Sequence, residues 1–135
     1  MNIPFLGRRR EDRRAHDAEG IGELLADCDL LRSQALREGV RLDDSEVSLE
    51  RLDQMLPRWR GDAEILDWLG NDAGLYLGTV IVRTVPGAAW SIRSDGQPVV
   101  RLASGREFDV VASGHAWAED GAPELSQLYG EVAEA

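Results

Sequence analysis

The stretch from Asp72 to Val111 constrains the fold of this chain most, because a strongly apolar segment precedes short alternating ones. The segment Ala73–Arg83 offers little polar surface, and its polar positions recur every three to four residues, which predicts a helix. A helix that is apolar nearly all round is usually buried in a domain. Val, Ile and Thr also favour strands, so a strand over 79–85 is the alternative. The polar positions are Asp72, Tyr76, Thr79 and Arg83.

Three short antiparallel strands are predicted next, at Ala89–Arg93, Pro98–Leu102 and Glu107–Val111. Both connections place Gly third in a three-residue loop, which suits a turn closed by a left-handed residue. The resulting register sets Arg101 opposite Glu107, a favourable cross-strand pair. We expect the apolar face to pack on the preceding helix. One face then carries Trp90, Ile92, Val100, Leu102, Phe108 and Val110, and the other carries Ser91, Arg93, Val99, Arg101, Glu107, Asp109 and Val111.

Further helices are predicted before the sheet from periodicity and capping residues. An amphipathic helix runs from Gly20 to Glu38 and stops at Gly39. The next runs from Glu46 to Leu56, capped by Asp44 or Ser45 and ended by Pro57. A short helix, Ala63–Leu69, is capped by Asp62 and ended by Gly70, after which Asn71 or Asp72 caps the apolar helix.

The C-terminal part is predicted as an irregular segment, Ala112–Ala122, and a last helix, Glu124–Ala133, opened by Pro123. The fold class is therefore α+β, with helices packed on one face of a three-stranded antiparallel meander. A chain of this length fits one domain, and we place it at 18–135. Residues 1–17 are predicted to be a disordered basic arm.

The charge of the chain is divided unevenly. Residues 1–14 hold five arginines and two acids, a net charge of +3, whereas the remainder holds ten arginines and 23 acids, a net charge of −13. An acidic body repels nucleic acid and anionic membranes, so we expect the folded body to bind no nucleic acid. No apolar run approaches the roughly 20 residues of a spanning helix. With a single cysteine and no recognisable secretion signal, the chain is expected to be cytoplasmic.

No motif for catalysis, cofactor binding or metal binding is found in the sequence. The chain has no lysine, which excludes a P-loop and Schiff-base chemistry with a side-chain amine. His115 has no histidine or cysteine at ligand spacing, and Cys28 lies on an apolar helix face. Trp59, between two arginines, is interpreted as a core residue. We therefore predict no catalytic residue, no cofactor and no metal ligand.

Several segments resemble a small actinobacterial domain-of-unknown-function family, over roughly residues 20–135. The resemblance implies no established activity. A helix with a central Tyr-x-Gly, followed by a tryptophan-bearing hairpin, is also similar to bacterial immunity-type and accessory modules. The segments that carry the family resemblance are Leu69–Arg83, Pro86–Trp90, Pro98–Leu102 and Ser126–Tyr129.

The leading hypothesis is a non-catalytic protein-interaction or regulatory module whose partner is another protein. Its candidate contact residues lie on the polar sheet face, and an open sheet edge is also compatible with a homodimer. The alternative is a small-molecule sensor with a pocket between helices and sheet, and an enzyme of unrecognised type is a third hypothesis. The contact residues are Arg93, Arg101, Glu107 and Asp109, and the pocket residues are Tyr76, Arg83 and Trp90.

Overall fold

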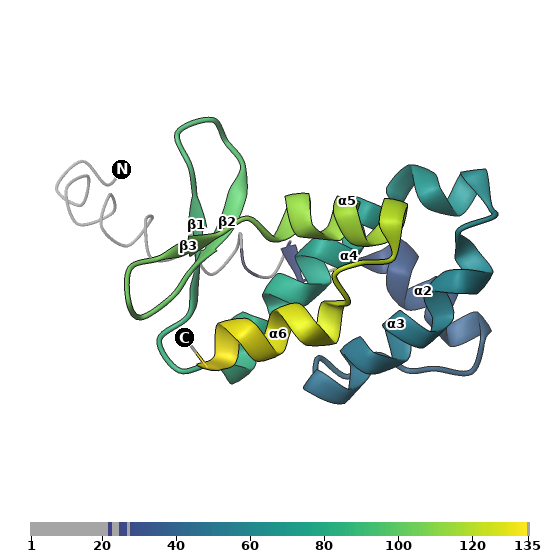
Figure 1. Ribbon diagram of the computed structural model, residues 1–135, viewed down its shortest axis with the longest axis horizontal. Helices are drawn as coiled ribbons and strands as arrows, with labels where there is room; N and C mark the ends of the chain where they lie inside the picture. Colours follow the sequence, from purple (N-terminus) through teal and green to yellow (C-terminus); the bar gives the residue numbers. More distant parts are fainter. Residues whose placement is uncertain (1–21, 23–24, 27, 135) are drawn as a thin grey trace, which may run out of the picture.

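Helix α4 (Ala63–Thr84) runs through the middle of the molecule and contacts α2, α3, α5, α6, β1 and β2 (Figure 1). The computed structural model describes residues 22, 25–26 and 28–134. The predicted basic arm at 1–17 lies outside them. The other elements are α2 (Asp29–Arg37), α3 (Glu46–Trp59), β1 (Ala89–Ile92), β2 (Pro98–Arg101), β3 (Glu107–Phe108), α5 (Val110–Asp120) and α6 (Leu125–Glu134).

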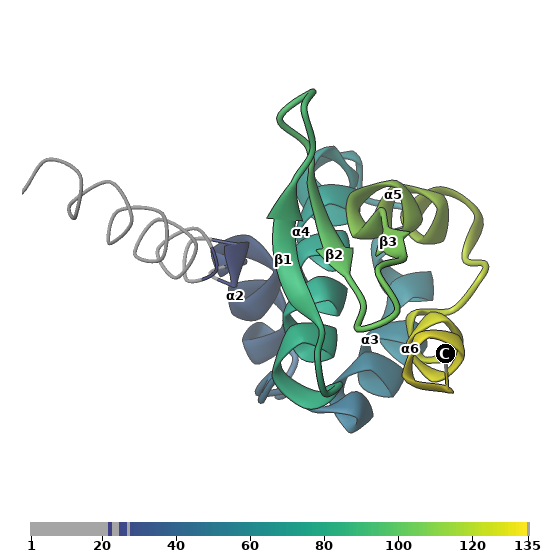
Figure 2. The ribbon, with the colours of Figure 1, turned by 90° about the vertical axis from the view of Figure 1, so that its left-hand side faces the viewer.

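The strands form one antiparallel sheet in the order β1-β2-β3, and Figure 2 shows the helices behind it. The predicted α+β class, with helices on one face of a three-stranded meander, is confirmed. The chain places α4 before the sheet and α5 directly after it, so both helices reach β2. The buried core lies between these elements.

Helix α4 is continuous, so the predicted break at Gly70 is wrong, as is the alternative strand over 79–85. Asp62 caps the helix as predicted, because its carboxylate accepts hydrogen bonds from the amides of Glu64 (3.0 Å) and Ile65 (3.4 Å). Asp72 caps a different helix from the one predicted. It lies inside α4, and its carboxylate accepts a hydrogen bond from the amide of Leu31 (3.2 Å) in the first turn of α2.

The glycines inside α4 are explained by close neighbours rather than by helix ends. A methyl group at Gly74 would lie 2.7 Å from the Cα of Val111 in α5, and one at Gly114 of α5 would lie 2.7 Å from the Cα of Gly74. Gly78 faces the ring of Trp90, which confirms that it packs closely against a neighbour. Glycine inside a helix costs about 0.8–1 kcal/mol relative to alanine, and here it permits the helix crossing.

The sheet register matches the prediction. Trp90 pairs with Val100, and Arg101 pairs with Glu107. The amide of Gly96 bonds to the carbonyl of Arg93 (2.8 Å), which closes the first three-residue loop, and Gly105 closes the second in the same way. Both glycines have φ near +90°, the left-handed conformation that the turn requires.

Two features of the sheet differ from the prediction. Strand β3 stops at Phe108, because the Asp109 carboxylate caps α5 by accepting a hydrogen bond from the amide of Ala112 (3.0 Å). The predicted irregular segment at Ala112–Ala122 is therefore wrong, since α5 fills most of it. In addition, Val99 is buried although it was placed on the polar face, and Ile92 is 45% exposed although it was placed on the apolar one.

The predicted helix is interrupted at Cys28, which adopts a left-handed conformation with φ of 46°, so α2 begins at Asp29; Gly22 and Leu25, before the interruption, are also helical. Residues 20, 21, 23, 24 and 27 of the predicted helix lie outside the described part of the chain. The predicted stop at Gly39 is confirmed. The amide of Val40 bonds back to the carbonyl of Ala35 (3.0 Å), and Gly39 has φ of 83°, which is the arrangement of a Schellman cap.

Helix α3 is capped by Ser45, whose hydroxyl accepts a hydrogen bond from the amide of Ser48 (3.3 Å). It does not end at Pro57, as predicted, but continues to Trp59. The proline occupies the last turn, so only two helical residues follow it. Trp59 is buried, as predicted, and its indole N–H donates to the carboxylate of Glu38.

One carboxylate in α3 joins the two C-terminal helices. Asp53 accepts hydrogen bonds from the Trp117 indole (2.9 Å) in α5 and from the amides of Leu125 (2.8 Å) and Ser126 (3.1 Å) at the start of α6. The Ser126 hydroxyl also donates to it (2.7 Å). Asp53 thus caps α6 from another helix. The residues predicted to face inward from this helix, Leu125, Leu128, Tyr129 and Val132, are buried.

Candidate functional site

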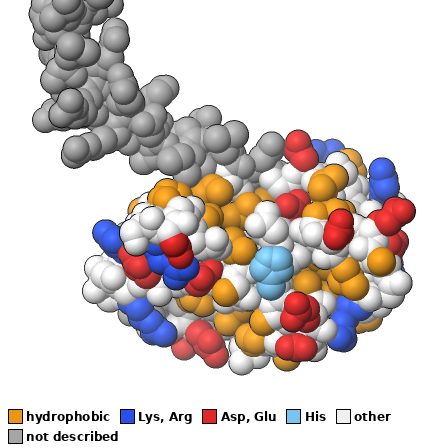
Figure 3. Space-filling view, turned by 90° about the horizontal axis from the view of Figure 1, so that it is seen from above, with side chains coloured by type: hydrophobic (Ala, Val, Ile, Leu, Met, Phe, Trp, Pro, Cys, Tyr) orange, Lys and Arg blue, Asp and Glu red, His pale blue; other side chains and the backbone are white. Residues whose placement is uncertain are grey.

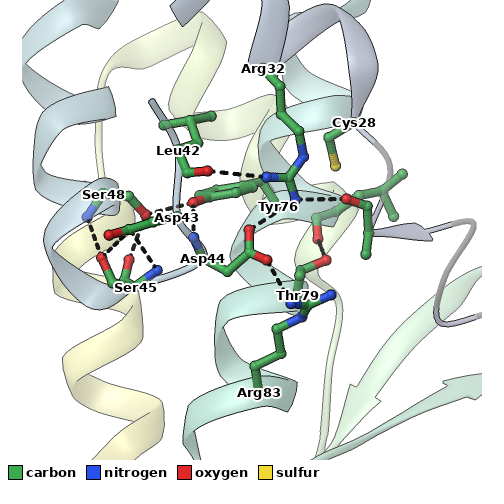
Figure 4. A network of polar contacts seen from close by, with 12 residues as sticks. Cys28, Arg32, Leu42, Asp43, Asp44, Ser45, Ser48, Tyr76, Thr79 and Arg83 are labelled. Carbon is green, nitrogen blue, oxygen red and sulfur yellow. Dashed lines mark hydrogen bonds and ion pairs between the residues drawn. The ribbon is translucent and has the colours of Figure 1, made fainter. Parts of the chain in front are cut away.

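A network of polar side chains surrounds Asp44, in the loop between α2 and α3 (Figure 4). The Asp44 carboxylate bonds to the guanidinium of Arg32 on one oxygen (2.9 Å) and to that of Arg83 on the other (2.9 Å). The Arg32 guanidinium also lies over the ring of Tyr76, 5.2 Å from its centroid. Asp44 has φ of 64°, a conformation rare for residues other than glycine. The two ion pairs therefore fix a strained loop onto α2 and α4.

Tyr76 is fully buried at the centre of this network, and its hydroxyl has two partners. The amide of Asp44 donates to it (2.8 Å). The Ser48 hydroxyl donates to the carbonyl of Ser45 (2.5 Å), so the tyrosine proton goes to the Ser48 oxygen (2.6 Å). Burial raises the pKa of Tyr76, and its hydrogen bonds with Ser48 and Asp44 only partly oppose this effect. A neutral phenol with its proton already donated is suited to holding elements together.

The three predicted pocket residues do not face one common cavity. Tyr76 and Arg83 meet at Asp44, but Trp90 packs against Gly78 on another side of α4. A methyl group at Gly78 would lie 2.8 Å from a ring carbon of Trp90, so the contact is tight.

The four predicted contact residues lie together on the sheet face and pair with one another. Arg101 bonds to Glu107 (2.8 Å), and Arg93 lies 3.5 Å from Asp109. Because Arg93 follows β1 and Asp109 follows β3, their ion pair crosses β2 on the face that carries Val99. This crossing accounts for the burial of Val99 on a face predicted to be polar. The charges on this face largely satisfy one another.

A groove between α2 and the first turns of α4 has a different character. We call it the α2–α4 groove, and its volume is about 320 Å³. Leu30 at its edge is 53% exposed, and Leu66, in the same turns of α4, is 38% exposed. Of these two side chains only Leu30 lines the groove, and an exposed apolar side chain in a concavity is typical of a binding surface. The groove is lined by Leu30, Ser33, Gln34, Arg37, Asp62, Glu64, Ile65 and Trp68.

Several polar groups of the α2–α4 groove are unused by the part of the chain that the structure describes. Within that part, the side chains of Trp68, Arg37 and Glu64 form no hydrogen bond or ion pair. The fully buried tryptophans differ, since the indoles of Trp59 and Trp117 both donate to carboxylates. Tryptophan and arginine are the residues that most often dominate binding energy at protein interfaces.

Sequence reasoning did not find this groove. Leu30 was predicted to lie in an amphipathic helix and Trp68 in a short one, and nothing in the sequence indicated that the two helices leave Leu30 exposed and Trp68 only half-buried beside each other. The available signal was Leu30 itself, because it lies beside the apolar stripe that Leu31 and Ala35 follow.

A second groove lies against α3 and has a volume of about 460 Å³. Its charged residues include two acids and two arginines, and Arg58 is already paired with Glu38 (3.2 Å). Burial opposes ionisation of Glu38, but hydrogen bonds from Trp59, Gln34 and Arg58 outweigh it and lower its pKa. Within the described residues, Glu50, Arg51 and Gln54 of this groove form no side-chain hydrogen bond or ion pair, but its lining has no aromatic side chain, unlike that of the α2–α4 groove. Its lining is Glu38, Val40, Val47, Glu50, Arg51, Gln54, Met55 and Arg58.

The two residues considered for chemistry lie apart from these surfaces. Cys28 is buried, and its thiol donates to the carbonyl of Leu25 (3.3 Å). His115 is exposed on α5. Figure 3 shows one face of the molecule, on which hydrophobic patches alternate with scattered charged side chains. Among the described residues, no three His, Cys, Asp or Glu side chains come together as a metal site. In the same part of the chain, no helix has the length and apolar character needed to cross a membrane.

The described residues form a small α+β fold with a buried polar network and two grooves of mixed apolar and charged character. The chain belongs to the family of unknown function DUF6278, whose model matches residues 1–135. The match extends over the whole chain, whereas the resemblance in the sequence covered only 20–135. Neither the curated proteins nor the solved structures include a match to this chain.

Proposed function

We propose that this chain is a non-catalytic protein-interaction module and that the α2–α4 groove is its contact surface. The observation that carries the proposal is the 53% exposure of Leu30 in the groove, beside Trp68 and Arg37, whose side chains form no hydrogen bond or ion pair within the part of the chain that the structure describes. A partner that covers the groove would bury apolar area and complete the unused hydrogen bonds, and both gains favour association.

The polar sheet face is the other candidate surface. Its residues Arg93, Arg101, Glu107 and Asp109 would have to exchange their present ion pairs for contacts with a partner. Exposed ion pairs contribute only about 0–1 kcal/mol each, so the exchange is feasible but gains little. Among the described residues, the charged side chains of the α2–α4 groove form no ion pair that a partner would have to break, which is why we favour the groove.

The sensor alternative, with a pocket at Tyr76, Arg83 and Trp90, has weaker support. A ligand there would need free polar groups in an apolar cavity. Tyr76 and Arg83 instead bond to Ser48 and Asp44, and Trp90 is packed on Gly78.

The proposal is tested by site-specific photo-crosslinking of the full chain in its native cells. A photoreactive residue at position 30, in the groove lining, should capture a defined protein. The same residue at position 92, where Ile92 is 45% exposed against 53% for Leu30 but lies on the sheet, should not. Trp68→Ala and, independently, the surface change Arg37→Glu should abolish the product. Capture of the same proteins from both positions, or in both variants, would contradict the proposal.

A further inference from the structure

The composition of the α2–α4 groove indicates which chemistry it would bind. Its apolar wall consists of Leu30, Ile65 and Trp68, and its polar rim carries two acids, Asp62 and Glu64, against one arginine, Arg37. Two further exposed acids, Asp29 and Asp67, adjoin lining residues in the chain. A segment with bulky apolar side chains followed by arginines would complement both the wall and the rim.

The chain itself contains a segment of this kind. Residues 3–6 are Ile-Pro-Phe-Leu, and five arginines follow within residues 8–14. Residues 1–14 carry a net charge of +3, opposite to the charge of −13 on the rest of the chain. Glu11 and Asp12, between the two groups of arginines, would suit the single arginine of the groove, Arg37.

The connecting chain is long enough for the segment to reach the groove of its own molecule. Fifteen residues lie between Leu6 and Gly22, the first described residue, which makes sixteen steps along the backbone. They span at most about 55 Å when extended. A domain of this size has a radius of gyration of about 14 Å and therefore a diameter of about 35–40 Å. Chain length permits docking at any point on the body.

We propose that residues 3–14 bind the α2–α4 groove of the same molecule, with Phe5 and Leu6 against the apolar wall and the arginines near its acidic rim. The inference rests on the proposed function, because it names a ligand for the same surface. The segment then competes with any outside partner, so binding of a partner requires its release. Competition of this kind makes the interaction dependent on salt, since the charged contacts are partly exposed.

The experiment uses the purified full chain with a photoreactive residue at position 30, in the groove lining, at low micromolar concentration. We expect crosslinks within one molecule to residues 3–14, identified by mass spectrometry after digestion. Replacing both Phe5 and Leu6 by serine should lower the yield about tenfold, because the apolar contacts are lost. About 0.5 M salt should also lower it. The control Leu36→Ser, at a 54% exposed residue of α2 outside the groove lining, should leave the yield unchanged.

The inference is overturned if no crosslink reaches residues 3–14, if the double serine variant crosslinks as well as the wild type, or if the products join two molecules. These outcomes differ from failure of the proposed function. If position 30 captures an outside protein in cells but never residues 3–14, the groove is a contact surface without an internal competitor. If it captures neither, both proposals fail.

Discussion

The crossing of α4 and α5 predicts opposite effects for the same substitution at two glycines. A methyl group at Gly114 would overlap the backbones of Gly70 and Gly74, with the Cα of Gly74 only 2.7 Å away, so the helices must separate. Overpacking of this kind costs about 1–3 kcal/mol. A methyl group at Gly130, in α6, meets no atom within 4 Å. There the gain in helix propensity is about 0.5–1 kcal/mol.

Gly114→Ala should therefore be less stable than Gly130→Ala by about 1–3 kcal/mol, because the gain in helix propensity is common to both; this is a large part of the 5–15 kcal/mol typical of a domain. Urea unfolding, followed by tryptophan fluorescence and by far-ultraviolet circular dichroism, measures the difference. The two variants share their chemistry and helical setting, so Gly130→Ala controls for propensity. Equal stability of the two would refute the argument that the crossing requires glycine.

Three further predictions concern polar side chains. Asp53→Ala should destabilise the fold by about 3–5 kcal/mol, because it removes the cap of α6 and leaves the buried Trp117 indole unpaired. The control Glu50→Ala, on the exposed side of the same helix, should change the free energy of unfolding in urea by under about 0.5 kcal/mol. Folding lowers the pKa of Glu38, so its ionised carboxylate stabilises the fold above the ordinary pKa of 4.5, and this stabilisation is lost as pH falls through the pKa of the folded state. The free energy of unfolding of Glu38→Gln should therefore fall less steeply than that of the wild type when urea titrations are repeated below pH 4.5. Tyr76→Phe should cost about 1–3 kcal/mol in thermal unfolding, since a buried amide loses its acceptor, and an unchanged melting temperature would contradict the assigned hydrogen bonds.

Local patterns predicted the parts of the fold that depend on neighbours in sequence. The two glycine-closed loops fixed the register of the sheet, and with it the pair between Arg101 and Glu107. The caps Ser45 and Asp62 and the stop at Gly39 were also read from adjacent residues. Each of these features is decided by contacts within a few positions of the chain.

The errors arose where a distant element changes the meaning of a local signal. Gly70 normally marks a helix end, but here it lies against His115 of α5, so α4 continues through it. Asp72 is a good capping residue, and it does cap a helix, but its amide partner is Leu31 in α2. Spacing along the sequence does not reveal such partners.

The candidate site shows the same division. The sequence placed Arg93, Arg101, Glu107 and Asp109 on one face, and the structure adds that they pair among themselves. The α2–α4 groove depends on the angle between two helices, and 25 residues of the chain lie between the end of α2 and the start of α4. No residue pattern within either helix predicts that angle.

The glycines at 70, 74 and 78 have a consequence for how the molecule folds and opens. Together they weaken the centre of α4 by about 2.5–3 kcal/mol relative to alanine, so this segment is a poor helix by itself. Its order depends on α5 and on Trp90 of β1, which follow it in the chain. The middle of α4 should therefore become protected from hydrogen exchange only together with α5 and the first hairpin, as one cooperative unit. The longest helix of the described chain is in this respect a product of the packing around it.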